Sequence, residues 1–465
     1  MEKRLIKPSP LSWMIGISAL VLFASSSLRH FLFQSTAWDL GIFDQAIYLI
    51  SQGKVPISSF LKFHILADHA AFILYPLALI YKIHPSVYWL FAVQSAALSL
   101  GALPAYFLSI QAGLRESQAI AVATAYLLYP VLYNANLFDF HPDSIAVPAL
   151  LTMIFAARER KIWKFCISVL LVLACKEVFS LTILAMGVCL LLCEKRRLYG
   201  VIAIISGVVW FVITTKLIIP FFGAEIASVE RHLGRYNYLG SSFNEAFQTL
   251  FSNPVMILKH IFTSDNFFYL FLLLIPVFWG FSYKSIIYLV GAIPCLVMNI
   301  LSNDQSQKDL IHQYSLPVLP FLILAVIASL AVGKGLLQNK RGIIIWSLIT
   351  FFCLAKFTHF TGKYLQYVDN LPTTREAVSL VKNQRSVYTT AEISPHLSNR
   401  ELIKFTDAGS PIENLDIFDY ILLNVRHPGW GSNQEFAQNL VQKLENNPKF
   451  QKQYNQDDVF LFVKK

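Results

Sequence analysis

Long apolar runs separated by short polar and basic segments dominate the chain. A bilayer-spanning helix takes roughly 17–25 mostly apolar residues. Runs of that length lie at 11–33, 86–110, 117–136, 198–219, 285–302, 314–332 and 342–362. Shorter apolar runs lie at 143–157, 162–175, 178–193 and 267–282. The pattern predicts an all-α polytopic membrane protein with about eleven transmembrane helices, because only helices and closed barrels can span lipid.

The apolar stretch 69–83 decides the orientation of every segment that follows it. If it does not cross the bilayer, the N-terminus, with Lys3, Arg4 and Lys7, shares its side with a set of short loops that all carry Lys or Arg. Those loops are 111–116, 158–161, 194–197, 283–284 and 333–341. The positive-inside rule places such loops in the cytoplasm. We therefore expect 69–83 to form a juxtamembrane or re-entrant helix, and the N-terminus to be cytoplasmic.

Two long outer loops and a polar tail then face the other side of a cell inner (plasma) membrane. A transmembrane domain over residues 1–362 carries the outer loops 34–85 and 220–266. Residues 363–465 have the alternating pattern of a small α/β unit, which we expect to be extracytoplasmic. Its predicted strands are 386–390, 402–405, 420–425 and 459–464, and its predicted helix is 434–446.

Composition agrees with a membrane protein and argues against nucleic-acid binding. Of the 465 residues, 55% are hydrophobic and 14% are charged, too few charges to cover a soluble domain of this size. The formal net charge is +10, but Lys and Arg stand in short clusters between apolar runs, as topology signals do. We therefore expect the bilayer, and no nucleic acid, as a partner.

The first candidate acids follow the first apolar run, in WDLGIFDQAIY. Asp39 is a candidate catalytic residue, or the N-cap of a helix that runs to about Ser51. Asp44 lies one and a half turns further along, as a second catalytic candidate or as part of a solvated helix face. Both alternatives stay open.

A second group of candidates lies between later apolar runs. Asp139, His141 and Asp143 stand within five residues in FDFHPD, and Glu177 follows Lys176 between two apolar runs. Ionisable groups at such places are costly and usually functional. In the alternative, Asp143 caps the next helix and Lys176-Glu177 is a plain turn.

Further polar side chains of the expected outer face are candidates for substrate binding. They are His64, His69, Lys176, Arg231, Arg235, Tyr236, His312 and Tyr314. Asp and His also suit a divalent metal ion, but no spacing in the sequence dictates such a site, so the cofactor stays unknown.

Six segments in this order, WDLGIFDQAIY, FHPDSIAVP, ACKE, RYNYLGSS, HQYSLPVLPF and AEISPHLSNR, resemble the domain of unknown function 2079 (DUF2079) family of prokaryotic membrane proteins. That family is grouped with the C-type (GT-C) glycosyltransferases, which use polyprenyl-phosphate sugars. The resemblance implies a catalytic acid just after the first span, matched by Asp39, and a second acid in the next outer loop, matched by Asp139 or Asp143. The acids of the first loop, Asp39 and Asp44, are not adjacent as in the usual GT-C motif.

Two functions from different classes remain. The resemblance favours a membrane glycosyltransferase, a transferase of the cell envelope that moves a hexosyl or pentosyl group from a polyprenyl-phosphate-linked donor to an acceptor on the extracytoplasmic face. The alternative is a transporter or flippase for a lipid-linked or small polar substrate, whose ionisable residues would line a pathway. The gathering of polar residues on one face, without a detectable internal repeat, favours the enzyme.

Overall fold

The computed structural model describes residues 9–223, 227, 229–382 and 384–465; Lys3, Arg4 and Lys7, expected in the cytoplasm, lie outside these ranges. The chain divides into two compact units, each described by itself below. Unit 1 comprises Met1–Ala24, Leu66–Ile73 and Ala92–Lys356. Unit 2 comprises Ser25–Ile65, Leu74–Phe91 and Phe357–Lys465.

Helices fill almost all of unit 1, and two further helices, α1 (Pro10–Phe31) and α5 (Tyr88–Leu100), pass from one unit into the other. The helices and helical turns of unit 1 are α3 (Leu66–His69), α6 (Ala102–Gln111), α7 (Glu116–Leu127), α8 (Pro130–Leu137), α9 (Asp143–Arg158), α10 (Ile162–Leu173), α11 (Phe179–Leu192), α12 (Arg197–Ile213), η2 (Thr214–Ile218), α13 (Ile219–Gly223), η3 (Val229–Leu239), α14 (Phe243–Ser252), α15 (Pro254–Ile261), α16 (Ser264–Leu274), η4 (Ile275–Gly280), η5 (Tyr283–Ala292), α17 (Ile293–Leu301), η6 (Gln305–Lys308), η7 (Gln313–Val318), α18 (Leu319–Ala331) and α19 (Lys340–Leu354). The segment 220–266, expected as a loop, therefore contains several helices.

Six helices within the described residues are long and apolar enough to cross a membrane. They are Pro10–Phe31, Tyr88–Gln111, Glu116–Leu137, Arg197–Gly223, Tyr283–Leu301 and Gln313–Ala331. Two bent pairs raise the number to eight if each is one span: Pro254–Ile261 with Ser264–Gly280 (50°), and Lys340–Leu354 with Lys356–Leu365 (42°). All seven long apolar runs of the sequence coincide with one of these helices or pairs. The total of eleven spans stays a prediction.

The stretch 69–83 does not form a spanning helix. It holds the end of α3 and the eight-residue α4 (Leu74–Tyr81), whose length of about 12 Å is far below the roughly 30 Å of a hydrocarbon core. The structure therefore agrees with the expected short helix in this stretch.

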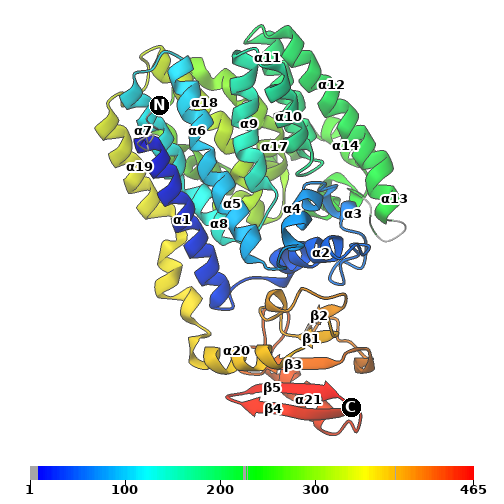
Figure 1. The fold of residues 1–465 in the computed structure, drawn as a ribbon. Helices are drawn as coiled ribbons and strands as arrows, with labels where there is room; N and C mark the ends of the chain where they lie inside the picture. The colour runs from blue at the N-terminus through cyan, green and yellow to red at the C-terminus, as the bar shows by residue number, and fades with distance from the viewer. Residues whose placement is uncertain (1–8, 224–226, 228, 383) are drawn as a thin grey trace, which may run out of the picture. The chain divides into compact units, whose positions relative to one another are not determined.

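Small residues bring α11 and α12 close together in unit 1, where α9 to α12 lie side by side (Figure 1). A Cβ added to Gly187 would lie 2.9 Å from the backbone oxygen of Gly200, and one added to Gly207 would lie 2.6 Å from that of Ser180. Backbones can approach this closely only where no side chain intervenes, which is how helices commonly pack in lipid.

Unit 2 contains a five-stranded mixed sheet in the order β2-β1-β3-β5-β4. β1 pairs in parallel with β2 and β3, whereas β5 pairs antiparallel with β3 and β4. The strands are β1 (Val387–Thr389), β2 (Ile403–Phe405), β3 (Tyr420–Asn424), β4 (Phe450–Gln456) and β5 (Val459–Lys464). The remaining elements of the unit are η1 (Ala37–Gly41), α2 (Ile42–Ser51), α4, η8 (Lys356–Thr361), η9 (Lys363–Leu365), η10 (Val368–Asn370), α20 (Leu371–Leu380), η11 (Ser394–His396), η12 (Leu415–Ile417) and α21 (Gln434–Glu445).

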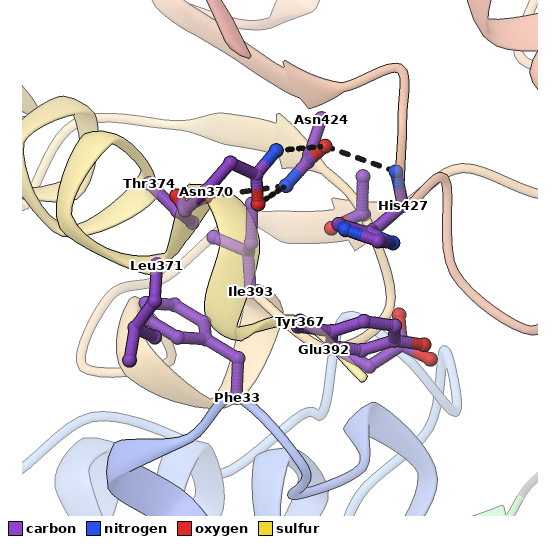
Figure 2. A pocket seen from close by; sticks show the side chains of 10 residues that line it. Phe33, Tyr367, Asn370, Leu371, Thr374, Glu392, Ile393, Asn424 and His427 are labelled. Carbon is purple, nitrogen blue, oxygen red and sulfur yellow. Dashed lines mark hydrogen bonds between the residues drawn. The ribbon is translucent and has the colours of Figure 1, made fainter. Parts of the chain in front are cut away.

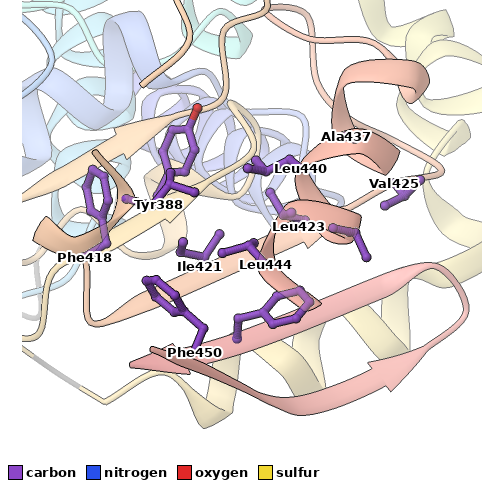
Figure 3. Packing of buried hydrophobic residues seen from close by; sticks show 12 residues of the cluster. Tyr388, Phe418, Ile421, Leu423, Val425, Ala437, Leu440, Leu444 and Phe450 are labelled. Carbon is purple, nitrogen blue, oxygen red and sulfur yellow. The ribbon is translucent and has the colours of Figure 1, made fainter. Parts of the chain in front are cut away.

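An apolar core joins α21 to this sheet. Leu440 and Leu444 of α21 pack with Ile421 and Leu423 of β3 and with Phe450 of β4 (Figure 3). Four strands and α21 lie where the sequence predicts them, within one or two residues. β4 is a strand that the pattern misses, because its sequence FQKQYNQ is mostly polar and mostly exposed, as an edge strand can be.

The first outer loop is part of the same unit as the tail. The Gln45 amide in α2 donates to the backbone oxygens of Arg400 (3.1 Å) and Glu401 (3.2 Å). The Ser59 hydroxyl donates to the Ile403 oxygen at 2.7 Å and accepts from the Ile403 N–H at 3.1 Å. These bonds tie residues of the 34–65 segment to β2 and the turn before it. A boundary at 362/363 between a membrane domain and an extracytoplasmic domain stays a prediction.

Candidate active site

In unit 1 the FHPD turn between α8 and α9 is buried and held from α5. The Gln94 side chain donates to the Asp139 backbone oxygen at 2.8 Å and accepts from the His141 N–H at 2.9 Å. Asp139 has a φ of +97°, a conformation that non-glycine residues adopt only where the surroundings enforce it, often at functional sites. Asp139 and His141 are 1% and 2% exposed. Gln94 therefore positions both candidates.

Asp143 does not act as the N-cap of α9, because Pro142 occupies that position. Its carboxylate instead forms an ion pair with the Lys176 ammonium, 2.7 Å away. Both side chains are almost fully buried. Burial lowers the pKa of Lys176, but the Asp143 charge outweighs it and the pKa lies above the ordinary value. Lys176, which we expected to bind substrate, is ion-paired with Asp143.

The next residue, Glu177, leads to a second charged group, formed with Asp68, His69, Arg231 and His232. His69 Nδ1 lies 3.4 and 3.3 Å from the two Glu177 oxygens, and its Nε2 lies 3.8 Å from an Asp68 oxygen. Arg231 forms an ion pair with the other Asp68 oxygen. The His69 and His232 rings stack with centroids 5.1 Å apart. These residues come from α3, the α10–α11 turn and η3.

Burial and mutual charge shift the pKa values in this group. Burial raises the pKa of Glu177, but the positive charge of His69 outweighs it, so the value is lowered. Burial lowers the pKa of His69, but Asp68 and Glu177 outweigh it and the value is raised. Burial, with the charges of His69 and Arg231, lowers the pKa of His232 to about 4. Burial raises the pKa of Asp68, but the charges of His69 and Arg231 outweigh it and the value is lowered. His232 is therefore neutral at pH 7, whereas both carboxylates are ionised.

A third group in unit 1 joins η3 to the segment before α18. Arg235 donates to the Tyr314 hydroxyl at 3.1 Å, and its guanidinium lies over the Tyr314 ring. The His312 ring meets Phe138 edge-on with centroids 4.1 Å apart, and Phe138 stacks on His141. The Tyr236 hydroxyl donates to the Met298 backbone oxygen at 3.0 Å. His312 thus connects this group to the FHPD turn.

The acids of the first loop lie in unit 2. The helical segment begins at Ala37 with Thr36 at the N-cap position, so Asp39 is in the first turn and the expected capping role is wrong. Asp39 is half-buried, and the Thr36 hydroxyl donates to its carboxylate at 3.5 Å. His64 is buried, which lowers its pKa.

Asp44 is buried rather than on a solvated helix face. It is 1% exposed, and its two oxygens accept hydrogen bonds from Tyr81 (2.5 Å) and Ser398 (2.7 Å). Burial raises its pKa to about 6, against the opposing effect of these two hydrogen bonds. This arrangement suits a residue that holds α2, α4 and the turn after η11 together better than an acid that meets substrate.

Unit 2 also contains a small pocket beside the sheet, with an empty volume of about 250 Å³ that includes open solvent. Figure 2 shows Asn370 and Asn424 facing each other in it, with hydrogen bonds of 3.1 and 3.2 Å between their amides. The Asn424 amide also donates to the Thr374 hydroxyl and accepts from the His427 N–H, so its hydrogen bonds are made within the protein.

Sequence reasoning missed Gln94, Tyr81 and Ser398 as parts of these groups. Asp68 and His232 are neighbours of the candidates His69 and Arg231. Nothing in the local pattern marks Gln94, which lies inside an apolar run. Ser398 lies in AEISPHLSNR, so the family resemblance was the available signal.

Comparisons with known proteins agree on a family and a fold. The family model described as "Predicted membrane protein (DUF2079)" matches residues 29–461. The crystal structure of ArnT from Cupriavidus metallidurans bound to undecaprenyl phosphate matches with a TM-score of 0.54 at 14% identity, covering 98% of each chain. Its apo form matches with a TM-score of 0.51 at 11% identity, covering 97% of each chain. No curated protein sequence matches.

At these identities the structural likeness establishes the fold, and the family match covers most of the chain. The chain therefore belongs to the DUF2079 family of predicted membrane proteins and has the fold of ArnT, a C-type glycosyltransferase.

Proposed function

We propose that this protein is a membrane glycosyltransferase that uses a polyprenyl-phosphate-linked sugar donor. The observation that carries the proposal is the likeness, over 98% of both chains, to a structure that holds undecaprenyl phosphate. The charged groups of unit 1 add support, since buried ionisable residues beside apolar helices are costly and usually functional. We also propose that the protein lies in the cell inner membrane and that the reaction takes place on its extracytoplasmic face.

The reaction needs a base for the acceptor and cations for the leaving phosphate. A carboxylate takes the proton of the acceptor hydroxyl, whose oxygen then attacks the anomeric carbon. The bond from that carbon to the phosphate oxygen breaks, and polyprenyl phosphate leaves with the electron pair. We assign the base to Asp39, which is half-buried, rather than to Asp44, whose two oxygens are both hydrogen-bonded inside unit 2.

Two arginines suit the leaving phosphate better than Lys176 does. Lys176 is nearly fully buried against Asp143, whereas the Arg235 side chain is 35% exposed and the Arg231 side chain 25% exposed. Arginine also binds phosphate through two parallel N–H groups. We therefore assign phosphate binding to Arg235 and Arg231.

Binding of undecaprenyl phosphate to the purified protein tests the donor class. Native mass spectrometry should detect one bound lipid, and Arg235→Ala should weaken binding about tenfold or more, as expected for loss of a charge-assisted contact. Arg426→Ala is the matched control, since Arg426 forms ion pairs with Asp369 and Asp458 in the tail. Absence of binding would contradict the proposal.

Transfer from radiolabelled undecaprenyl-phosphate hexoses and pentoses to membrane acceptors then tests the reaction itself. The transporter or flippase alternative makes the opposite prediction. In that case labelled lipid would change leaflet in proteoliposomes without loss of its sugar.

A further inference from the structure

Two histidines and a carboxylate from distant parts of the chain approach one another in unit 1. Asp68 and His69 belong to α3, and His232 belongs to η3. One ligand atom from each lies within 4.8 Å of the others. Zinc holds N and O ligands at about 2.0–2.2 Å, so small side-chain rotations would bring all three atoms onto one ion. We propose that Asp68, His69 and His232 bind a divalent cation of the zinc class.

The Glu177 carboxylate orients the His69 ring for metal binding. The Nδ1 atom of His69 faces the Glu177 carboxylate at 3.3–3.4 Å, while Nε2 lies on the Asp68 side, 3.8 Å from Oδ2. A carboxylate that accepts a hydrogen bond from one ring nitrogen keeps the proton on that nitrogen. The other nitrogen then offers its lone pair to a metal. A hydrogen bond of 3.1 Å from the Glu177 N–H to the His69 backbone oxygen fixes the two segments to each other.

Arg231 orients the carboxylate of Asp68. It ion-pairs with Oδ1 and donates to the Asp68 backbone oxygen at 3.0 Å. This leaves Oδ2 as the oxygen that faces His69. Arg231 Nε also lies 3.3 Å from His232 Nε2, a long contact that a cation bound at this nitrogen would replace.

The charge of the group favours a cation. Asp68 and Glu177 bring two negative charges and Arg231 one positive charge, while Lys176 is neutralised by Asp143 at 2.7 Å. Metal ligation displaces the Nε2 proton of His69, and with both imidazoles neutral the group carries one net negative charge, which is costly to bury without compensation. The side chains of His69 and Asp68 are 26% and 17% exposed, so an ion can reach them.

A bound divalent ion would give this group a net positive charge. If the proposed function holds, such an ion would attract the phosphate of the donor next to Arg231, and this one consequence rests on that function. Metal binding itself does not, because it follows from the three ligands alone.

Metal content of the full-length protein in detergent is the direct test. After exposure to Zn²⁺ and desalting, elemental analysis should find about one zinc per chain, and Asp68→Asn and His232→Ala should each lower the zinc affinity at least tenfold. His260→Ala is the control, because His260 stacks on Tyr238 in the same region of the chain and is not one of the three ligands. Sub-stoichiometric zinc in the wild type, or equal binding by His232→Ala, would overturn the proposal.

Cobalt substitution provides a second readout and guards against variants that misfold. Co²⁺ in a tetrahedral site of N and O ligands absorbs in the visible range, and His69→Gln should abolish that spectrum in protein whose Tm without metal matches the wild type. Stoichiometric zinc binding and a full cobalt spectrum without any sugar transfer would support this site and refute the glycosyltransferase. The reverse result, transfer by metal-free protein that binds no zinc, would do the opposite.

Discussion

The Tyr81 hydroxyl donates a 2.5 Å hydrogen bond to Asp44 Oδ1 in the interior of unit 2. Ser398 donates to the other oxygen, so one buried carboxyl joins the first-loop helix α2, the short helix α4 and the tail. Tyr81 is itself 1% exposed, and burial followed by the charge of Asp44 raises its pKa well above the ordinary value. Asp44 is therefore placed to influence the stability of unit 2 as pH changes.

We expect the stability of unit 2 to fall as pH rises from about 4 to about 6, the pKa of Asp44. The folded pKa lies above the ordinary value of 3.8 for an aspartate, so the folded state binds the proton more tightly than the unfolded state does. The stabilisation that the protonated Asp44 contributes is then complete below the pKa of the unfolded state and is lost above the pKa of the folded state. The upper limit is about 3 kcal/mol, since one unit corresponds to about 1.4 kcal/mol.

Asp44→Asn should remove this pH dependence. Its amide can still accept from Tyr81, and Ser398, which already donates to the Pro395 oxygen, can accept from the new N–H group. The measurement is the Tm at pH 4.5 and pH 7.5, with the half-exposed Asp39→Asn as the control. An unchanged pH profile in Asp44→Asn would show that another group is responsible.

Asp39→Asn should abolish sugar transfer without unfolding the protein. The change keeps the size of the side chain but removes its basicity, and loss of a general base typically lowers the rate by about 10²–10⁴-fold. Asp39 is not the N-cap, so little stability should be lost. The assay is transfer from a labelled polyprenyl-phosphate sugar, alongside Tm. Retained activity in Asp39→Asn together with lost activity in Asp44→Asn would mean that the base is assigned to the wrong acid.

Asp143→Asn should destabilise unit 1 more than it affects the chemical step. It leaves the Lys176 ammonium buried without its partner, a change that typically costs about 3–5 kcal/mol. The double variant Asp143→Asn/Lys176→Met removes the stranded charge and should recover part of the loss. Thermal unfolding of the two single variants and the double variant measures the coupling. If the stability losses of the two single variants simply add up in the double variant, the two side chains do not interact energetically.

Membrane topology should follow the basic loops. Reporter fusions after residues 115, 160, 196 and 338 should report the cytoplasm, and fusions after residues 60, 240 and 400 the outside, because loops rich in Lys and Arg are retained inside. α4 is too short to add a crossing. An outside signal at 160 with a cytoplasmic signal at 240 would reverse the orientation.

The apolar pattern alone located the long helices and four of the five strands, because burial against lipid or a core leaves a local periodicity in the sequence. The same pattern marked Asp39, Asp139, His141 and Glu177 as polar exceptions at helix ends. It could not show that Asp143 pairs with Lys176, that Gln94 holds the FHPD turn, or that Asp44 is buried.

Those relationships were decided by the tertiary structure, because each joins segments that lie far apart in the chain. Asp68 and His232 are separated by more than a third of the sequence, and only the packing of α3 and η3 within unit 1 brings their ligand atoms within 4.8 Å. A side chain's partner, and with it its charge and chemistry, depends on this packing and leaves no trace in local spacing. The sequence by itself therefore determined the helices and the candidate acids, while the fold decided which acid is half-buried, which is fully buried in an ion pair and which could hold a metal ion.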